Sequence, residues 1–329
     1  MRWVGIDEAG YGPNLGPLVM TAVIAEAESE LPEAGRSRGK ATPDLWRDLA
    51  ATVSRAGGDA SRCWVDDSKA LLRFRHGRER LQAACLALLE GGCPGDLDSR
   101  GGLLAAVGTD LAAAELDRWS SNGWAESPWP EEAVLRFRRG WAEDPFRPPD
   151  RGWRIRAVRS VMLGPEEFNR RLARSASKAV VHFSVFRSLL EAIWELAVDG
   201  LPTRVRCDKH GGRHYYYEQL IESFPGCWID RGPEGPALSR YQIRDETRTM
   251  GIALSPRADS RDGFVALASM VSKTLREVWM EAFNGFWIEH LPLLRPTAGY
   301  PGDSLRFRHL IEPTAKKLGL DPSLWWRAR

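Results

Sequence analysis

The chain has 329 residues, of which 43% are hydrophobic and 27% are charged, so it can bury a sizeable core and is not of the disordered class. Its 46 basic and 44 acidic residues leave a net charge of +2, which neither requires nor excludes a nucleic-acid partner.

The five cysteines are odd in number and form no C-x-x-C pair, which is typical of a reduced chain. The apolar start of the chain reaches Asp7 too soon to be a signal peptide, and no apolar stretch is long enough to cross a membrane. We therefore expect a cytoplasmic protein without a membrane segment.

The pattern of apolar residues in the first part of the chain predicts two paired strands followed by helices. An apolar run at 3–6 and a β-branched, apolar run at 18–25 flank a glycine-rich turn at 10–16. This pattern is typical of two strands that open an antiparallel meander. The next predicted elements are a short helix near Leu45, a strand at 63–65 and an amphipathic helix at 78–89.

Residues 91–151 differ in character from their surroundings. They begin with GGCPG, end in several prolines, and contain a predicted helix at 103–116 and a Trp-rich stretch. This indicates an insertion packed on the main body. The tryptophans from Trp119 to Trp153 could form a nucleic-acid platform, but buried packing is the favoured interpretation. The basic run at 136–139 suits phosphate contact or a solvated helix face equally.

The second half of the chain alternates strands with helices, which indicates a mixed α/β fold. The tail at 291–329 is predicted to be loop and short helix. The other predicted elements are strands at 153–163, at 204–207, around 241–244 and around 251–254, and helices at 178–198, 213–223 and 264–286.

Two adjacent carboxylates, Asp7 and Glu8, end the first predicted strand and are followed at once by the glycine-rich turn. Glycines let a substrate approach the backbone amides, as in dinucleotide-binding loops and P-loops. However, bare carboxylates beside a phosphate repel it unless a cation intervenes, and Pro13 interrupts the start of a helix. The combination of an acidic pair and a glycine loop therefore favours a phosphate bridged by a metal ion.

Two further aspartates fit the same interpretation. Asp208 ends a predicted strand, and Asp259 precedes a long predicted helix. Carboxylates at several strand ends can converge on hard cations, and a pair of divalent ions promotes phosphodiester hydrolysis. Taken singly, each aspartate is more often a turn or N-cap residue.

The order of these residues carries a resemblance to ribonuclease HII, particularly its archaeal and eukaryotic branch. The sequence GIDEAGYGPNLGPLV at 5–19 resembles the first motif of that family, and DSK at 67–69 resembles the second. RADS at 257–260 with ALASMVSK at 266–273 resembles the segment that carries the last catalytic aspartate and its helix. GYPGD at 299–303 resembles the Gly-Tyr-Pro motif with its junction-sensing tyrosine.

This resemblance covers most of the chain outside 91–151 and the extreme C-terminus. It implies an α/β, ribonuclease H-like mixed sheet flanked by helices, with a Trp-rich insertion and a helical C-terminal extension. Residues 1–290 would form the catalytic domain, with the insertion at about 91–151. Residues 291–329 would form a C-terminal tail that contacts the substrate.

The resemblance also implies a site. The catalytic and metal-binding acids of the family correspond to Asp7, Glu8, Asp208 and Asp259. The KHGG sequence after Asp208 differs from the sequence usual at this position in the family. In the family such acids hold two Mg²⁺ or Mn²⁺ ions, of which one activates water and the other stabilises the departing 3′-oxygen. The implied partner is an RNA/DNA hybrid or ribonucleotide-containing DNA. The substrate-binding residues would be Gly10, Tyr11, Gly12, Lys69, Lys273 and Tyr300.

Two positions depart from the family pattern. Tyr11 replaces the arginine of the family's Gly-Arg-Gly turn, so the guanidinium that would hold a phosphate is missing. Ribonuclease HIII also lacks that arginine and cleaves hybrids. Glu277 replaces an aspartate at the end of the helix motif. Lys69 and Lys273 could neutralise the acids or hold a phosphate, or they could simply be solvated.

Other features allow competing interpretations. The tyrosines at 215–217 could stack on bases, although packing at a helix start is favoured. A zinc site is a minor alternative to a groove-lining or structural role for the two histidines of this region. Its ligands would be Cys207, His210, His214 and Cys227.

Two functions from different classes remain. The first is a nuclease that cuts RNA in RNA/DNA hybrids, and the retention of four mutually repelling acids favours it. The second is a nucleic-acid-binding relative with lost or altered cleavage, and the missing arginine favours it. Cleavage of a labelled hybrid with Mg²⁺ or Mn²⁺ distinguishes the two functions.

Overall fold

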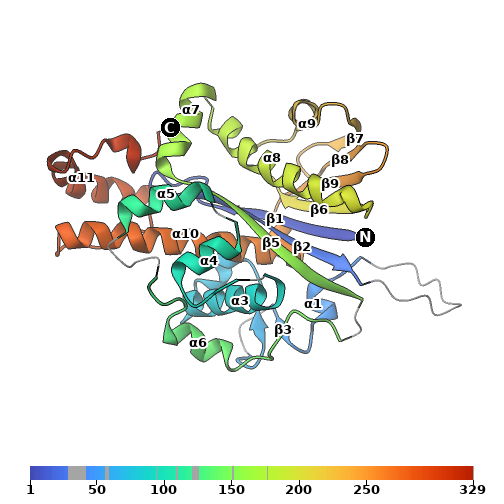
Figure 1. The fold of residues 1–329 in the computed structure, drawn as a ribbon, viewed down its shortest axis with the longest axis horizontal. Coiled ribbons are helices and arrows are strands. Elements are labelled where there is room, and N and C mark those ends of the chain that lie inside the picture. The colour runs from blue at the N-terminus through green and yellow to red at the C-terminus, as the bar shows by residue number, and fades with distance from the viewer. Residues whose placement is uncertain are drawn as a thin grey trace, which may run out of the picture.

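A mixed sheet in the strand order β5–β2–β1–β6–β9–β8–β7 organises the chain (Figure 1). The computed structural model describes residues 1–28, 42–55, 59–93, 95–108, 110–120, 126–149, 152–175 and 177–328. The strands of this sheet are β1 (Arg2–Ala9), β2 (Leu18–Ala27), β5 (Trp153–Leu163), β6 (Thr203–Asp208), β7 (Trp228–Glu234), β8 (Ser239–Arg244) and β9 (Thr249–Ser255). A separate parallel pair is formed by β3 (Val53–Ser54) and β4 (Cys63–Trp64).

The pairing of the strands confirms the predicted mixed α/β class. β1, β2 and β5 form the expected antiparallel meander. β6 then lies parallel to β1, and β9 lies parallel to β6. β8 and β7 extend the sheet by antiparallel pairing. The carboxyl ends of β1, β6 and β9 therefore meet at one edge of the sheet.

Helices flank the sheet (Figure 1). On one side, α10 packs on β1 and β2, and α3 packs on α10 and β5. On the other side, α8 packs on β2 and β5. The longer helices are α3 (Gly77–Gly92), α5 (Asp110–Trp119), α7 (Pro165–Ser175), α8 (Lys178–Leu196), α10 (Gly263–His290) and α11 (Pro301–Lys317). The shorter helices are α1 (Leu45–Asp48), α2 (Ser68–Leu71), α4 (Arg100–Ala106), α6 (Glu132–Arg138), α9 (Tyr217–Ser223), and the 3₁₀ turns η1 (Ala197–Asp199), η2 (Ala258–Ser260) and η3 (Pro322–Leu324).

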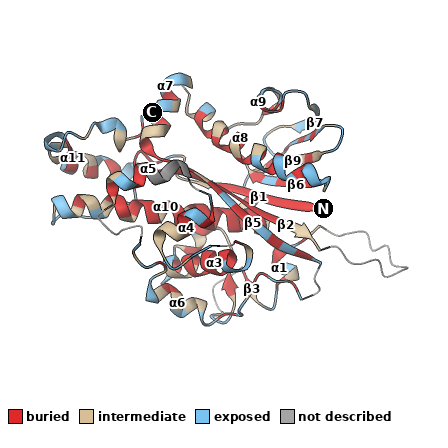
Figure 2. Cartoon of the chain, viewed as in Figure 1, coloured by how far each residue is buried: buried red, intermediate tan, exposed pale blue. Residues whose placement is uncertain are grey.

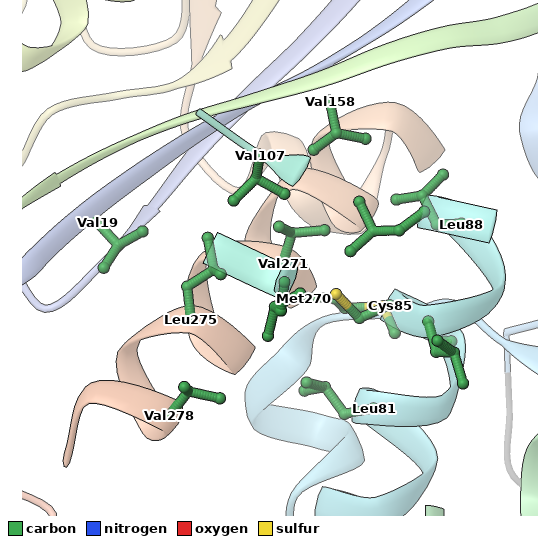
Figure 3. Packing of buried hydrophobic residues seen from close by; sticks show 14 of the residues in the cluster. Val19, Leu81, Cys85, Leu88, Val107, Val158, Met270, Val271, Leu275 and Val278 are labelled. Carbon is green, nitrogen blue, oxygen red and sulfur yellow. The ribbon is translucent and has the colours of Figure 1, made fainter. Parts of the chain in front are cut away.

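The alternation of side chains along β1 divides the core into two clusters. Trp3 faces the cluster formed with α3 and α10, whereas Val4 and Ile6 face the cluster formed with α8. Figure 2 shows β1 and much of α10 as buried. In Figure 3, side chains of α3 such as Leu81 and Cys85 point toward side chains of α10. No helix among the described residues is long and apolar enough to cross a bilayer.

Gly5 allows α10 to lie unusually close to β1. A Cβ atom at this position would lie 2.2 Å from the carbonyl carbon of Phe264, in the first turn of α10. Any larger residue would therefore push the helix away from the strand. This contact fixes α10 against the strand that carries the acidic pair.

The Trp-rich segment packs against the main body as favoured from the sequence. Trp119, Trp129 and Trp141 are all buried, and Trp119 lies edge-on to Phe283 of α10 at a centroid distance of 5.0 Å. Trp124 lies outside the described residues. The basic run at 136–139 lies at the end of α6 and supplies ion pairs to Glu90 and Glu132. The extent of the insertion and the boundary at 290 stay predictions.

Several elements differ from the sequence-based prediction. The helix expected at 103–116 is divided between α4 and α5, because Gly108 adopts a φ of 72° between them. The helix expected at 213–223 begins only at Tyr217. The tail contains a helix of 17 residues, α11, rather than a short one. β7 and α7 were not expected. β7 is mostly exposed and has no apolar alternation. α7 has apolar residues at helical spacing, but only Phe168 and Leu172 are large, and charged residues surround them.

Replacing Trp119 with alanine should lower the free energy of unfolding by about 3–5 kcal/mol, because its fully buried ring fills the space between α5 and α10. Urea unfolding followed by fluorescence and circular dichroism measures the change. Trp228→Ala is the matched control, since that ring is 55% exposed and its loss should cost less than about 0.5 kcal/mol. Equal costs for the two variants would contradict this packing role.

Candidate active site

Three of the four predicted acids come from neighbouring segments at the carboxyl edge of the sheet. The parallel register pairs Ile6 with Cys207, so the next residues, Asp7 near the end of β1 and Asp208 at the end of β6, lie side by side. Asp259 lies in η2, directly after β9, the other neighbour of β6. The Asp208 carboxylate accepts a hydrogen bond of 3.4 Å from the backbone N–H of Ala258 in the same turn.

The electrostatics of these acids show that they influence one another. Burial raises the pKa of Asp7 well above its ordinary value, and the charges of Glu8 and Asp259 raise it further. Burial also raises the pKa of Asp208, with a smaller contribution from Glu8. The pKa of Asp259 is raised first by burial and then by the charges of Asp67 and Asp208. Such mutual repulsion favours either protonation or a bound cation.

α10 contacts Asp7 from one side. The hydroxyl of Ser269 forms a hydrogen bond with the Asp7 carboxylate, which lowers its pKa in part. The hydroxyl of Ser272 donates to the Asp7 carbonyl at 3.1 Å. Within the described residues, no group of three or more His, Cys, Asp or Glu side chains has the arrangement of an assembled metal site. The acids therefore lie near one another without forming a closed set of ligands.

Glu8 points to the opposite side of β1, as alternation along a strand requires. Its Oε1 lies 3.5 Å from Nε2 of His182 on α8, and its buried Oε2 has no hydrogen-bond partner among the residues that the structure describes. His182 is 1% exposed and also contacts the ring of Tyr11 edge-on, at a centroid distance of 4.6 Å. His182 was not predictable from the sequence, because one histidine on the apolar face of a helix carries no distinguishing signal.

The zinc alternative does not fit the register of the strands. Cys207 and His210 do lie together, with Sγ and Nε2 3.5 Å apart. Cys227, however, precedes Trp228, which pairs with the far end of β8, whereas Cys207 lies beside the first residue of β8 through β9. The length of β8 therefore separates Cys227 from the other two groups. Burial lowers the pKa of His210 well below its ordinary value, as expected for a neutral histidine that packs in the core.

The tyrosines at 215–217 divide between packing and exposure. Tyr216 is fully buried and its backbone N–H donates to the hydroxyl of Tyr241 at 3.0 Å. Tyr215 is 66% exposed. The favoured packing interpretation is thus confirmed for Tyr216.

Two buried arginines hold the glycine-rich turn from behind. The guanidinium of Arg327 donates to the carbonyl of Gly10 at 2.6 Å and also to the carbonyl of Pro13. The guanidinium of Arg276 donates to the carbonyl of Leu15 at 3.1 Å. Both arginines are almost completely buried, so neither presents a charge to solvent.

The front of the same turn is open. Gly10 has a φ of 90°, and a Cβ there would lie 2.3 Å from the carbonyl oxygen of Pro17. By contrast, a Cβ at Gly12 would meet no atom within 4 Å. Backbone groups around Gly12 are therefore accessible to a ligand, while those behind Gly10 are occupied by the fold.

The predicted substrate-binding lysines and tyrosine border this region. The ammonium group of Lys273 donates to the hydroxyl of Tyr300 at 2.8 Å. Burial alone would raise the pKa of Tyr300, but the hydrogen bond and charge of Lys273 lower it below its ordinary value. Lys69 is exposed, and its charge opposes in small part the rise that burial and the charges of Asp67 and Asp208 cause in the pKa of Asp259. Glu277 is half-buried on α10, where desolvation raises its pKa, and it lies 3.4 Å from the guanidinium of Arg78.

Comparisons with known proteins give structural likenesses only. No profile of a known protein family matches the chain, and no curated protein matches its sequence. The structure is similar to those of type 2 ribonucleases H over its whole length. The PCNA–RNase HII complex from Archaeoglobus fulgidus matches at 16% identity, over 100% of this chain and 95% of that chain, with a TM-score of 0.39.

Two further structures match in the same way. The ribonuclease H2 of Pyrococcus horikoshii OT3 is 16% identical, with 99% of this chain and 92% of that chain covered and a TM-score of 0.43. Bst-RNase HIII, solved in complex with Mn²⁺, is 14% identical, with 99% of this chain and 66% of that chain covered and a TM-score of 0.41.

Replacing Arg327 with methionine should destabilise the protein by about 2–5 kcal/mol, because it leaves the buried carbonyls of Gly10 and Pro13 without a donor. Methionine retains most of the apolar stem, so the change reports mainly on the lost hydrogen bonds. The midpoint and slope of urea unfolding provide the measurement. Arg295→Met, at an exposed position, is the control. If both variants unfold like the wild type, the hydrogen bonds of Arg327 to the glycine-rich turn do not stabilise the fold.

Proposed function

We propose that this chain is a metal-dependent endoribonuclease that hydrolyses the RNA strand of RNA/DNA hybrids. The observation that carries the proposal is the placement of Asp7, Asp208 and Asp259 on neighbouring segments at one edge of the sheet. Glu8 follows Asp7 at this edge, and the open glycine turn begins two residues later. Sequence motifs in the order found in ribonuclease HII support the same assignment.

The acids fit a hard divalent cation. Their donors are carboxylate oxygens, which Mg²⁺ and Mn²⁺ prefer. Within the described part of the chain the buried Oε2 of Glu8 has no hydrogen-bond partner, and burial together with neighbouring negative charge raises the pKa of Asp7. Asp7, Glu8, Asp208 and Asp259 would hold the cations, two by analogy with the family. When bound, such ions supply an activated water and stabilise the departing 3′-oxygen.

Other residues would bind and orient the nucleic acid. Backbone groups at Gly10 and Gly12 would contact the ribose, and the Tyr300 ring would stack on a neighbouring sugar. Lys69 and Lys273 would place positive charge beside the scissile phosphate. Tyr300 is 44% exposed and hydrogen-bonded to Lys273, so its ring is available in a fixed orientation. The substrate would be a continuous hybrid or DNA that contains ribonucleotides.

A binding protein without efficient cleavage is the second candidate. The observation that favours it is the contact between Tyr11 and His182. A tyrosine at this position has no guanidinium to offer a phosphate, and its ring packs against a buried histidine instead. Such a protein would still bind hybrid through its backbone and lysine contacts, but would turn it over slowly.

A cleavage assay tests the proposed function directly. A labelled RNA/DNA hybrid incubated with Mg²⁺ or Mn²⁺ should be cut in its RNA strand by the wild type. Asp7→Asn should bind the hybrid but lose detectable cleavage, because one carboxylate ligand is removed. Asp117→Asn, which changes an exposed acid elsewhere, is the matched control and should retain activity. Wild-type protein that binds hybrid without cutting it, with either ion, would favour the second candidate.

Tyr11 should determine how well a single embedded ribonucleotide is recognised. A charge-assisted contact is roughly twice as strong as a neutral one, so the loss of arginine costs about 1–2 kcal/mol of discrimination. We therefore expect efficient cleavage of continuous hybrid and weaker cleavage at a lone ribonucleotide, with Tyr11→Arg improving the latter roughly five- to thirtyfold.

The ratio of kcat/KM for the two substrates measures this effect. Tyr11→Phe keeps the ring against His182 and removes only the hydroxyl, so it separates packing from hydrogen bonding. If the wild type already cuts both substrates equally and the arginine variant gains nothing, Tyr11 is a packing residue alone.

A further inference from the structure

Among the described residues, no helix packs on one face of the sheet formed by β6, β9, β8 and β7. Along β8 burial alternates strictly, with Tyr241 and Ile243 in the core and their neighbours exposed. β6 alternates in the same way. Figure 1 shows α8 and α9 on one side of these strands, and α10 packs on β1 and β2 instead. The exposed residues of the opposite face are Arg204, Arg206, Trp228, Asp230, Arg240, Gln242 and Arg244.

The strand register places these side chains in two rows. Arg206 pairs across Ala253 with Arg240, and Arg204 pairs across Gly251 with Gln242. Since adjacent strands are about 4.8 Å apart, the two rows lie about 10 Å from each other. The small residues of β9 between them leave a flat floor. The face is therefore a shallow tract with cationic side chains along both sides.

The tract carries an excess of positive charge. Arg204 and Arg240 are exposed and have no ion-pair partner among the described residues. Arg206 is paired with Asp262 at 2.8 Å, and Arg244 with Asp230 at 3.1 Å. The unpaired arginines favour a partner with a repeating negative charge.

Trp228 adds a feature that phosphate binding alone does not require. Its ring is 55% exposed on this same face, beside Arg244, whose guanidinium lies 5.4 Å from the ring centroid. An exposed aromatic ring beside arginines on an open sheet is a surface on which unpaired bases stack. A base inside a duplex cannot stack in this way, so the ring favours a single strand.

The tract is continuous with the candidate active site. Side chains two residues apart on a strand share a face, so Asp208 follows Arg204 and Arg206 along β6. A strand that leaves the acids in this direction would pass directly onto the arginines.

We propose that this face, the β6–β9–β8–β7 tract, binds single-stranded nucleic acid that flanks the hybrid in the substrate. Its arginines contact the phosphates and Trp228 stacks on a base. The flanking position rests on the proposed function, whereas binding of a single strand does not. The protein would therefore prefer a hybrid with an unpaired extension to a blunt one.

Binding measured by fluorescence anisotropy in EDTA tests the proposal without any cleavage. The probes are a labelled strand of about 20 thymidines, a blunt RNA/DNA hybrid and the same hybrid with a single-stranded extension, each longer than the site of one binding fold. The variants are Trp228→Ala and the pair Arg204→Ala with Arg240→Ala. Arg231→Ala is the matched control, since Arg231 is exposed on the same hairpin but pairs with the inward-facing Tyr241.

Trp228→Ala should weaken binding of the single strand at least about fivefold, and Trp228→Phe should restore most of it. The double arginine variant should reduce the slope of log K against log salt by about 1.4. Both should leave the blunt hybrid within about twofold and abolish the preference for the extension. These results would stand even if the protein failed to cut hybrid, so the two proposals fail independently.

Two outcomes would overturn the proposal. One is that the tract variants affect the single strand no more than Arg231→Ala does. The other is that they weaken the blunt hybrid as much as the single strand, which would assign the tract to duplex phosphates. Unchanged circular dichroism and thermal midpoints confirm that the exposed substitutions leave the fold intact.

Discussion

The close approach of α10 to β1 at Gly5 is the contact on which the candidate active site depends. Because no Cβ fits there, the helix lies directly against the strand and stays in register with it. Ser269 and Ser272 then reach Asp7, and one turn further on Arg276 reaches the glycine-rich turn. A single glycine thus sets the distance between the acids and the groups that surround them.

One side of the glycine-rich turn is filled by buried arginine side chains, whereas the side at Gly12 is open. Arg276 and Arg327 place two guanidinium groups in the interior, where burial lowers the pKa of both. Buried charge of this kind is costly unless it is fully hydrogen-bonded. Here backbone carbonyls accept hydrogen bonds from one terminal nitrogen of each guanidinium. The Nε of both arginines and Nη1 of Arg327 have no hydrogen-bond partner among the described residues, so the cost is offset only in part. The turn is held rigid by the far C-terminus, while Gly12 stays free of contacts.

The four acids lie close enough for their negative charges to repel one another. Asp7 is nearly inaccessible, Glu8 faces a buried histidine on the other side of the strand, and Asp208 and Asp259 share the edge between β6 and η2. Burial and like charge raise the pKa of each aspartate. Stability alone gives no reason to crowd such groups, and for that reason perturbed acids at a strand edge point to function.

The sequence by itself determined the elements with a regular apolar period and the local chemistry of the acidic pair. The helix at 264–286 was predictable because packing on a core imposes a period of 3.6 on its apolar residues. The strand at 18–25 was predictable because burial on both faces requires a continuous run of apolar, often β-branched residues. β7 was not, because its residues are mostly exposed and are held by pairing with β8 rather than by burial. The length of α11 was also hidden, since Pro313 interrupts its pattern.

Only the tertiary structure decided which distant groups meet. His182 beside Glu8, Arg327 behind Gly10 and Trp228 among the arginines of the tract all bring together residues far apart in the chain. No local propensity encodes such contacts, because they depend on parallel strand pairing and on the docking of α10 and the tail. The sequence therefore identified the acids, whereas the fold determined what supports and surrounds them.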